Sequence, residues 1–177
     1  MPAYQNREVD VLTGRSSREF LAVLTFGVGV ERVSVEVESC ESNVGRARRF
    51  VHEQLQSWGL AEDYDFVDRV LLVVSELVTN AVLHGRTLPQ DEAETLGLTL
   101  AWKGGCVFGV MVTDNSCKVP LVRMRVSPSA RGGRGLVLVN AQSDGWTADP
   151  RRSGKAVWAF FECARSAALP ELMPQPA

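Results

Sequence analysis

Residues 65–84 constrain the fold more than any other segment, because apolar side chains recur along them with the helical period. The stretch "SELVTNAVLHG" at the end of this run adds Glu76, Asn80 and His84 at intervals of four residues. On a helix these three side chains lie above one another over two turns, in or beside the face that should be buried. The sequence therefore predicts a core helix that carries one polar stripe.

The polar stripe has two explanations, since a buried carboxylate without a partner is costly. In the first, Glu76 pairs with an arginine elsewhere in the chain and Asn80 bonds to a backbone group. In the second, both side chains face a ligand. His84 fits an ordinary residue at the C-terminal end of a helix at least as well as a ligand contact.

The remaining segments predict an α+β fold. Alternating valines in "RVSVEVES" (32–39) indicate a strand, and the amphipathic pattern of 42–59 indicates a helix with Ser42 or Ser39 as its cap and Gly59 as its stop. Further strands are predicted at 96–102, 106–113 and 155–163, and a further helix at 135–146. Short hairpin connections and grouped helices favour a two-layer α/β sandwich, with a mixed, mostly antiparallel sheet and helices on one face.

The chain is expected to contain one main domain. Residues 31–164 would form it, residues 1–30 would be a partly flexible N-terminal extension, and residues 165–177 a disordered tail. The apolar stretch "FLAVLTFGVGV" (20–30) is too short to span a bilayer. It is expected to be an extra strand or a short buried segment, with a contact surface for a partner or a second copy as the alternative.

Charge and cysteine spacing exclude several classes of protein. The formal net charge is −2, whereas proteins that hold nucleic acid through their overall charge are usually basic. None of the four cysteines falls in a C-x-x-C pair and the two histidines lie far from them, which argues against a zinc site. Scattered cysteines favour free thiols in a reducing compartment, so we expect a cytoplasmic protein.

Three further features bear on a ligand site. Asp114 ends a predicted strand, where polar groups commonly face a cleft, although an aspartate in "DNS" also forms turns. Residues 115–133 form a long loop, and loops of that length in a compact domain are usually functional. In "RGGRGL" (131–136) glycines open a predicted helix, whose N-terminus could bind phosphate through free N–H groups. Neither the dinucleotide-binding fingerprint nor a P-loop pattern is present.

Taken in order, these motifs resemble the Bergerat ATP-binding fold of the gyrase, chaperone, histidine-kinase and mismatch-repair superfamily. Within it, the chain looks most similar to the small anti-sigma factor serine kinases and their stand-alone ATP-binding relatives, over about residues 32–163. The segments that carry the resemblance are "RARRFVHEQLQSWGL", "SELVTNAVLHG", "VTDNS", "GRGLVLVNAQSDGW" and "GKAVWAFF".

The resemblance implies ATP and Mg²⁺ as cofactors and a role for each matching residue. Asn80 would ligate Mg²⁺ and Glu76 would be the general base that takes a proton from an attacking serine hydroxyl. Asp114 would accept a hydrogen bond from the adenine amino group, and residues 115–132 would form a lid over ATP. The implied nucleotide contacts are Asn80, His84, Asp114, Arg131, Gly133, Arg134, Gly135, Leu136 and Lys155.

Some of these contacts carry a sharper expectation. Gly133 and Gly135 would leave backbone N–H groups free for the phosphates, and Arg131 is placed like a lid arginine that contacts the terminal phosphate. Lys155 stands where relatives often have a small hydroxyl side chain. The chain also departs from the family after Asp114, because residues 115–118 read Asn-Ser-Cys-Lys in place of the usual glycines.

Two functions follow from the resemblance. The first is a serine/threonine protein kinase that acts as an anti-sigma factor and phosphorylates an anti-sigma factor antagonist, with a sigma factor as a further partner. The second is an ATP-binding module that sequesters a partner with little or no kinase turnover. Glu76 favours the kinase, because a pure binder needs no base beside Asn80. Relatives often form homodimers, of which the sequence itself carries no independent sign.

A histidine-kinase catalytic fragment is a weaker alternative. "VHEQL" at 51–55 resembles a phosphoacceptor His-Glu pair. His52 lies only 28 positions before Asn80, however, on a helix expected to pack in the same domain. That leaves no room for a dimerisation helix pair, so His52 is expected to be an ordinary helix residue. The resemblance implies neither a membrane nor a nucleic acid as partner.

Overall fold

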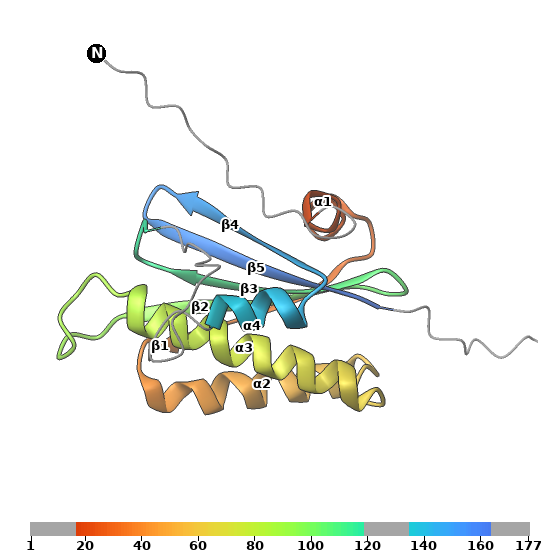
Figure 1. The fold of residues 1–177 in the computed structure, drawn as a ribbon, viewed down its shortest axis with the longest axis horizontal. Helices are drawn as coiled ribbons and strands as arrows, with labels where there is room; N and C mark the ends of the chain where they lie inside the picture. Colours follow the sequence, from red (N-terminus) through yellow and green to blue (C-terminus); the bar gives the residue numbers. More distant parts are fainter. Residues whose placement is uncertain (1–16, 119–134, 164–177) are drawn as a thin grey trace, which may run out of the picture.

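The computed structural model describes residues 17–118 and 135–163. Figure 1 shows one open sheet with helices packed against it. The elements in chain order are α1 (Ser17–Phe26), β1 (Glu31–Glu38), the short 3₁₀ helix η1 (Glu41–Asn43), α2 (Val44–Ser57), α3 (Tyr64–His84), β2 (Thr95–Lys103), β3 (Val107–Asp114), α4 (Gly135–Gln142), β4 (Gly145–Arg151) and β5 (Gly154–Glu162). The sheet order is β1-β2-β3-β5-β4, and each neighbouring pair is antiparallel. The predicted α+β class is confirmed.

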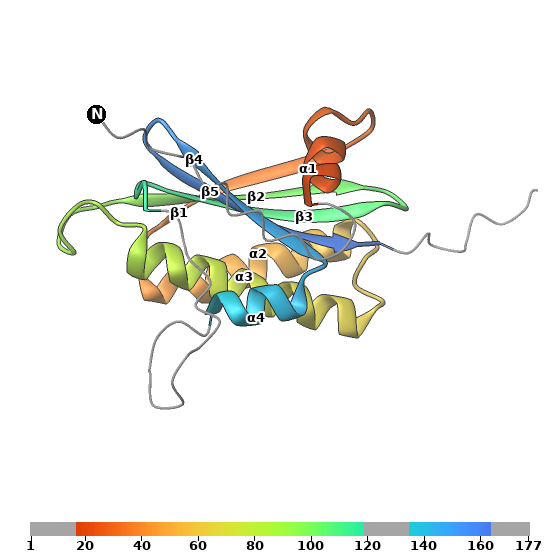
Figure 2. The same cartoon turned by 45° about the horizontal axis from the view of Figure 1, so that its top comes forward.

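The main core lies between the sheet and the layer formed by α2, α3 and α4, all on one face (Figure 2). The helix predicted at 65–84 is α3, and it begins where the side chain of its N-cap, Asp63, accepts a 3.0 Å hydrogen bond from the Phe66 amide. Its fully buried residues include Val70, Val74 and Val78. Burying a valine side chain stabilises a fold by about 1.5 kcal/mol or more, so this apolar face holds α3 on the sheet.

The helix α1 lies on the opposite face of the sheet (Figure 2), where it forms a second, smaller core. The predicted strand within residues 20–30 is therefore wrong. The other expectation, a short buried segment, is correct for the part of the stretch that lies in α1. Phe20 and Leu24, one turn apart, are buried against a group that includes Trp158 and Phe160. A short apolar run fits a strand or a buried helix equally well by periodicity, which explains the error.

The helix predicted at 135–146 ends early, and the strand that follows it was not predicted. α4 stops at Gln142, and β4 covers Gly145–Arg151 at the edge of the sheet. The stretch "GWTADPR" contains Gly, Asp and Pro, which are depleted in strands. An edge position tolerates Pro150 because only one side of an edge strand needs ladder hydrogen bonds.

The boundaries of α2 agree with the sequence at one end only. The N-cap is Asn43, the last residue of η1, and it makes no side-chain capping bond; its side-chain Nδ2 atom donates to the Glu38 carbonyl instead. The caps predicted at Ser42 or Ser39 are therefore wrong. The predicted stop is confirmed, because Gly59 has a φ of 69°, which favours glycine.

Two composition-based points concern the described part of the chain. Among residues 17–118 and 135–163, no helix has the length and apolar character needed to cross a bilayer. All four cysteines lie in these residues, and each has a free thiol.

Candidate functional site

Glu76 and Asn80 lie one turn apart on α3, and both side chains face the first residue of α4. A Cβ atom added to Gly135 would lie 2.7 Å from Oε2 of Glu76 and 3.3 and 3.4 Å from Nδ2 and Oδ1 of Asn80. Real Cβ atoms almost never approach another heavy atom within 3.0 Å. Glycine at position 135 therefore lets the start of α4 lie directly against the polar stripe.

The two stripe residues are half-buried, and neither has a partner in the described parts of the chain. Among residues 17–118 and 135–163, no hydrogen bond or ion pair involves the Glu76 carboxylate or the Asn80 amide. The arginine that would explain Glu76 as a structural residue is thus not found among these residues. The Glu76 carboxylate and the Asn80 amide face the N-terminus of α4, which begins with a glycine. Because they have no partner among these residues, they suit the binding of a polar ligand.

Arg69 ties the far end of α4 to α3. Its Nε atom donates to the Gln142 carbonyl over 2.9 Å, and its Nη2 atom lies 3.1 and 3.2 Å from the carboxylate oxygens of Asp144. Asp144 also accepts from the Glu162 amide over 2.8 Å, which links this turn to β5. These bonds fix the position of α4, and hence the distance of Gly135 from the stripe.

Asp114 and Lys155 form a buried ion pair at adjoining ends of β3 and β5. They are register partners across the two strands, and Nζ of Lys155 lies 2.7 Å from Oδ1 of Asp114. The two residues are only 8% and 5% exposed. Oδ1 also accepts from the Ser116 amide over 3.0 Å, so the turn-forming role considered for "DNS" is present. The ion pair itself was not predicted.

Two glycines bring the rest of the site up to Asp114. A Cβ atom on Gly85, just after α3, would lie 2.5 Å from Cβ and Cγ of Asp114. Gly154 has a φ of 119°, and a Cβ atom there would lie 1.9 Å from the Asp114 carbonyl oxygen. The end of α3, the end of β3 and the start of β5 therefore meet at Asp114.

Glu94 organises the loop between α3 and β2, although nothing in the sequence singled it out. Its carboxylate accepts from the Thr87 and Leu88 amides and the Thr87 hydroxyl at 2.9 to 3.2 Å, and from Nδ2 of Asn115 at 2.8 Å. Burial alone would raise the pKa of Glu94, but these hydrogen bonds lower the pKa to about 2. Asn115 thus ties the segment after Asp114 to this loop.

Because the folded pKa of Glu94 lies below its ordinary value of 4.5, the ionised carboxylate stabilises the fold above pH 4.5. We expect this contribution to be lost progressively as the pH falls from 4.5 to about 2. Urea unfolding across this range should show a smaller loss of stability for Glu94→Gln than for the unmodified chain. Glu92→Gln, two residues away and exposed, is the matched control. Parallel curves for the Glu94 variant and the unmodified chain would contradict the assignment.

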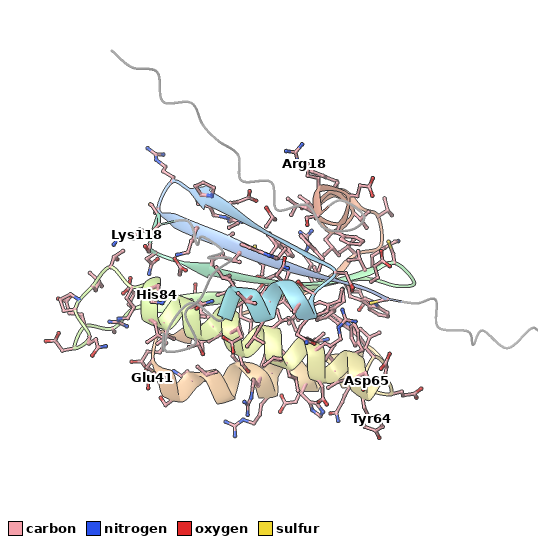
Figure 3. All side chains as sticks on the ribbon, in the orientation of Figure 1. Arg18, Glu41, Tyr64, Asp65, His84 and Lys118 are labelled. Carbon is pink, nitrogen blue, oxygen red and sulfur yellow. The ribbon has the colours of Figure 1, made fainter. Side chains whose placement is uncertain are left out.

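The other predicted site residues divide into three groups. His84 is exposed at the end of α3, where Figure 3 labels it. Among the described residues, no hydrogen bond links its side chain to Glu76. Leu136 is half-buried and packs against the main core. Three of the predicted nucleotide contacts, Arg131, Gly133 and Arg134, lie outside the described residues, as do residues 119–132 of the predicted lid. Their roles stay predictions.

The Arg86 guanidinium is committed to the loop after α3. It donates to the carbonyls of Ser39, Pro89 and Glu92 over 2.7 to 2.8 Å, and its Nε atom lies 3.7 Å from Oε2 of Glu94. These contacts give Arg86 a structural role, and they hold the C-terminal end of α3 beside β1 and β2.

Comparison with known proteins agrees with this arrangement. The family described as histidine kinase-like ATPase domain matches residues 37–161. No curated protein matches the chain. Thirteen chains of solved structures match it. One is the crystal structure of the RsbU and RsbW domains of Rv1364c from Mycobacterium tuberculosis, with 20% sequence identity and a TM-score of 0.50. The alignment covers 76% of this chain and 33% of that chain, so this protein spans about one third of its length. At this identity the likeness shows a shared fold alone.

Proposed function

The chain belongs to the histidine kinase-like ATPase domain family, and from this premise we propose that it binds Mg-ATP and phosphorylates a serine of a protein partner. Residues 31–164 would form the ATP-binding domain. The observation that carries the proposal is the pair Glu76 and Asn80, which have no partner in the described residues and face Gly135 at the start of α4.

The residues present fit this ligand. Gly135 lets the N-terminal end of α4, where backbone N–H groups attract phosphate, lie directly beside Glu76 and Asn80. Asn80 offers an amide oxygen, a ligand type that suits Mg²⁺. Asp114 lies where α3, β3 and β5 meet, and it would accept the hydrogen bond from the adenine amino group. Its Oδ2 atom has no hydrogen bond with a described residue.

Each residue would then have one task. ATP would supply the γ-phosphoryl group, and Mg²⁺ would offset the negative charge of its phosphates. Asn80 would hold the metal. The Glu76 carboxylate would accept the proton of the serine hydroxyl as the serine oxygen bonds to the γ-phosphorus and ADP leaves. Arg131, Gly133 and Arg134 would complete the phosphate contacts.

We expect Asn80→Ala to weaken Mg-ATP binding by about 10- to 100-fold, the usual effect of removing a bond to a charged group. Isothermal titration calorimetry with Mg-ATP measures it. Thr79→Ala, on the same turn of α3 but outside the stripe, should bind as the unmodified chain does. No heat with the unmodified chain would overturn ATP binding, and equal affinity for Asn80→Ala would remove only the metal-ligand assignment.

The sequence resemblance supports an anti-sigma factor antagonist as the phosphorylated partner and a sigma factor as a second one, in the cytoplasm, with a homodimer as the arrangement to test. Sequestration of a partner without useful turnover is the alternative function. Capture of partners from the native cell, followed by incubation with Mg-ATP, separates the two. Phosphoserine on a captured protein supports the kinase, whereas stable capture without phosphoserine supports sequestration.

A further inference from the structure

The buried ion pair at Asp114 places a donor and an acceptor side by side where the strands β3 and β5 end. Nζ of Lys155 donates to Oδ1 of Asp114 over 2.7 Å and to the Ser116 carbonyl over 3.2 Å. An ammonium group has three N–H donors, and the described residues use two of them. Oδ2 of Asp114 likewise has no bond with a described residue. The pair therefore has one free donor next to one free acceptor, as far as the described residues show.

A buried ion pair is poor at stabilising a fold, because removing two charges from water offsets most of their attraction. The turn after β3 also has a bond that does not involve the lysine, since the Ser116 amide donates to Asp114. A role in recognition accounts for a buried ammonium better than a role in folding. The polar edge of adenine has the matching pattern, with an amino donor on C6 beside the ring acceptor N1.

We propose that Lys155 reads the base: its third N–H donates to N1 of adenine, beside the amino group that Asp114 accepts. This inference rests on the proposed function and adds to it a second base-reading residue. The site then recognises two adjacent atoms of the base, one through a carboxylate and one through an ammonium group. A nucleotide without a ring acceptor at this position would leave a buried N–H of Lys155 unpaired. A site of this kind therefore binds such a nucleotide much more weakly.

The test compares ATP with 1-deaza-ATP, in which a C–H group replaces N1, by calorimetry on the full chain. We expect the unmodified chain to bind 1-deaza-ATP on the order of 10- to 100-fold more weakly than ATP. 7-Deaza-ATP, which keeps N1 and the amino group, is the matched ligand control and should bind within about threefold of ATP. Lys155→Met should bind ATP and 1-deaza-ATP equally, because the group that distinguishes them is gone.

The outcomes separate this inference from the function on which it rests. No heat with ATP overturns the proposed function, and this inference with it. ATP binding with equal affinity for 1-deaza-ATP overturns the inference alone. If Lys155→Met does not fold, the double variant Asp114→Asn with Lys155→Met leaves no unpaired buried charge. Persistent discrimination against 1-deaza-ATP by either variant would show that another group contacts N1.

Discussion

Replacing Lys155 by methionine should lower the free energy of unfolding by about 3 to 5 kcal/mol, the usual cost of breaking a buried ion pair by removing one partner. Methionine has nearly the shape of the lysine stem, so the change removes the charge with little effect on packing. The Asp114 carboxylate, 8% exposed, is then left buried with only the Ser116 amide among its described partners. Urea unfolding, monitored by circular dichroism at pH 7, measures the loss.

The double variant Asp114→Asn with Lys155→Met distinguishes an unpaired charge from simple loss of packing. It keeps the side-chain oxygen that accepts from the Ser116 amide, and it contains no buried charge at this position. We expect it to recover most of the stability that the single variant loses. Lys103→Met, which changes a half-buried lysine on β2, should cost far less. A loss below about 1 kcal/mol for Lys155→Met would mean that the pair behaves like an exposed one.

The elements that were predictable from sequence are those with a long, regular pattern. The apolar face of α3 repeats over 21 residues, and its first and last residues, Tyr64 and His84, agree with the predicted range 65–84 to within one residue. β1 alternates cleanly, with its valines toward the main core. α1 and β4 failed for opposite reasons. α1 has too few residues for its period to exclude a strand, and β4 consists of residues that rarely form strands and does so only because β5 supplies a pairing edge.

The candidate site divides in the same way. A stripe on one helix and a glycine before another could be recognised locally, and the structure brings Glu76, Asn80 and Gly135 together. The pairing of Asp114 with Lys155 could not be recognised, because it depends on the register of two strands 41 residues apart in the chain. Glu94 was missed because one glutamate in a polar loop has no periodic signal. Its importance comes from bonds to Thr87 and Asn115 that only the folded chain creates.

Glu76→Gln should reduce phosphoryl transfer to the partner serine by about 10²- to 10⁴-fold, the usual contribution of a general base. Glutamine has the size and shape of glutamate, so the start of α4 at Gly135 should stay in place. Its amide oxygen cannot accept the proton of the serine hydroxyl at neutral pH. Mg-ATP affinity should remain within about threefold of the unmodified chain, because metal binding is assigned to Asn80. Initial rates of phosphoserine formation on the captured partner, measured by mass spectrometry, provide the test.

The control must be the same Glu-to-Gln substitution at a position outside the site. Glu53→Gln, on the exposed side of α2, is that control and should leave the transfer rate unchanged. A Glu76→Gln variant that binds Mg-ATP and transfers at the normal rate would remove Glu76 as the base while leaving kinase activity intact.

No transfer by the unmodified chain, with ATP and partner both bound, would favour the sequestering module. Glu76 would then be a half-buried carboxylate that faces phosphate, an arrangement that costs stability and needs a compensating positive group. Arg131 and Arg134 are the candidates for that group, and replacing either one by Gln should then weaken ATP binding more than Glu76→Gln does.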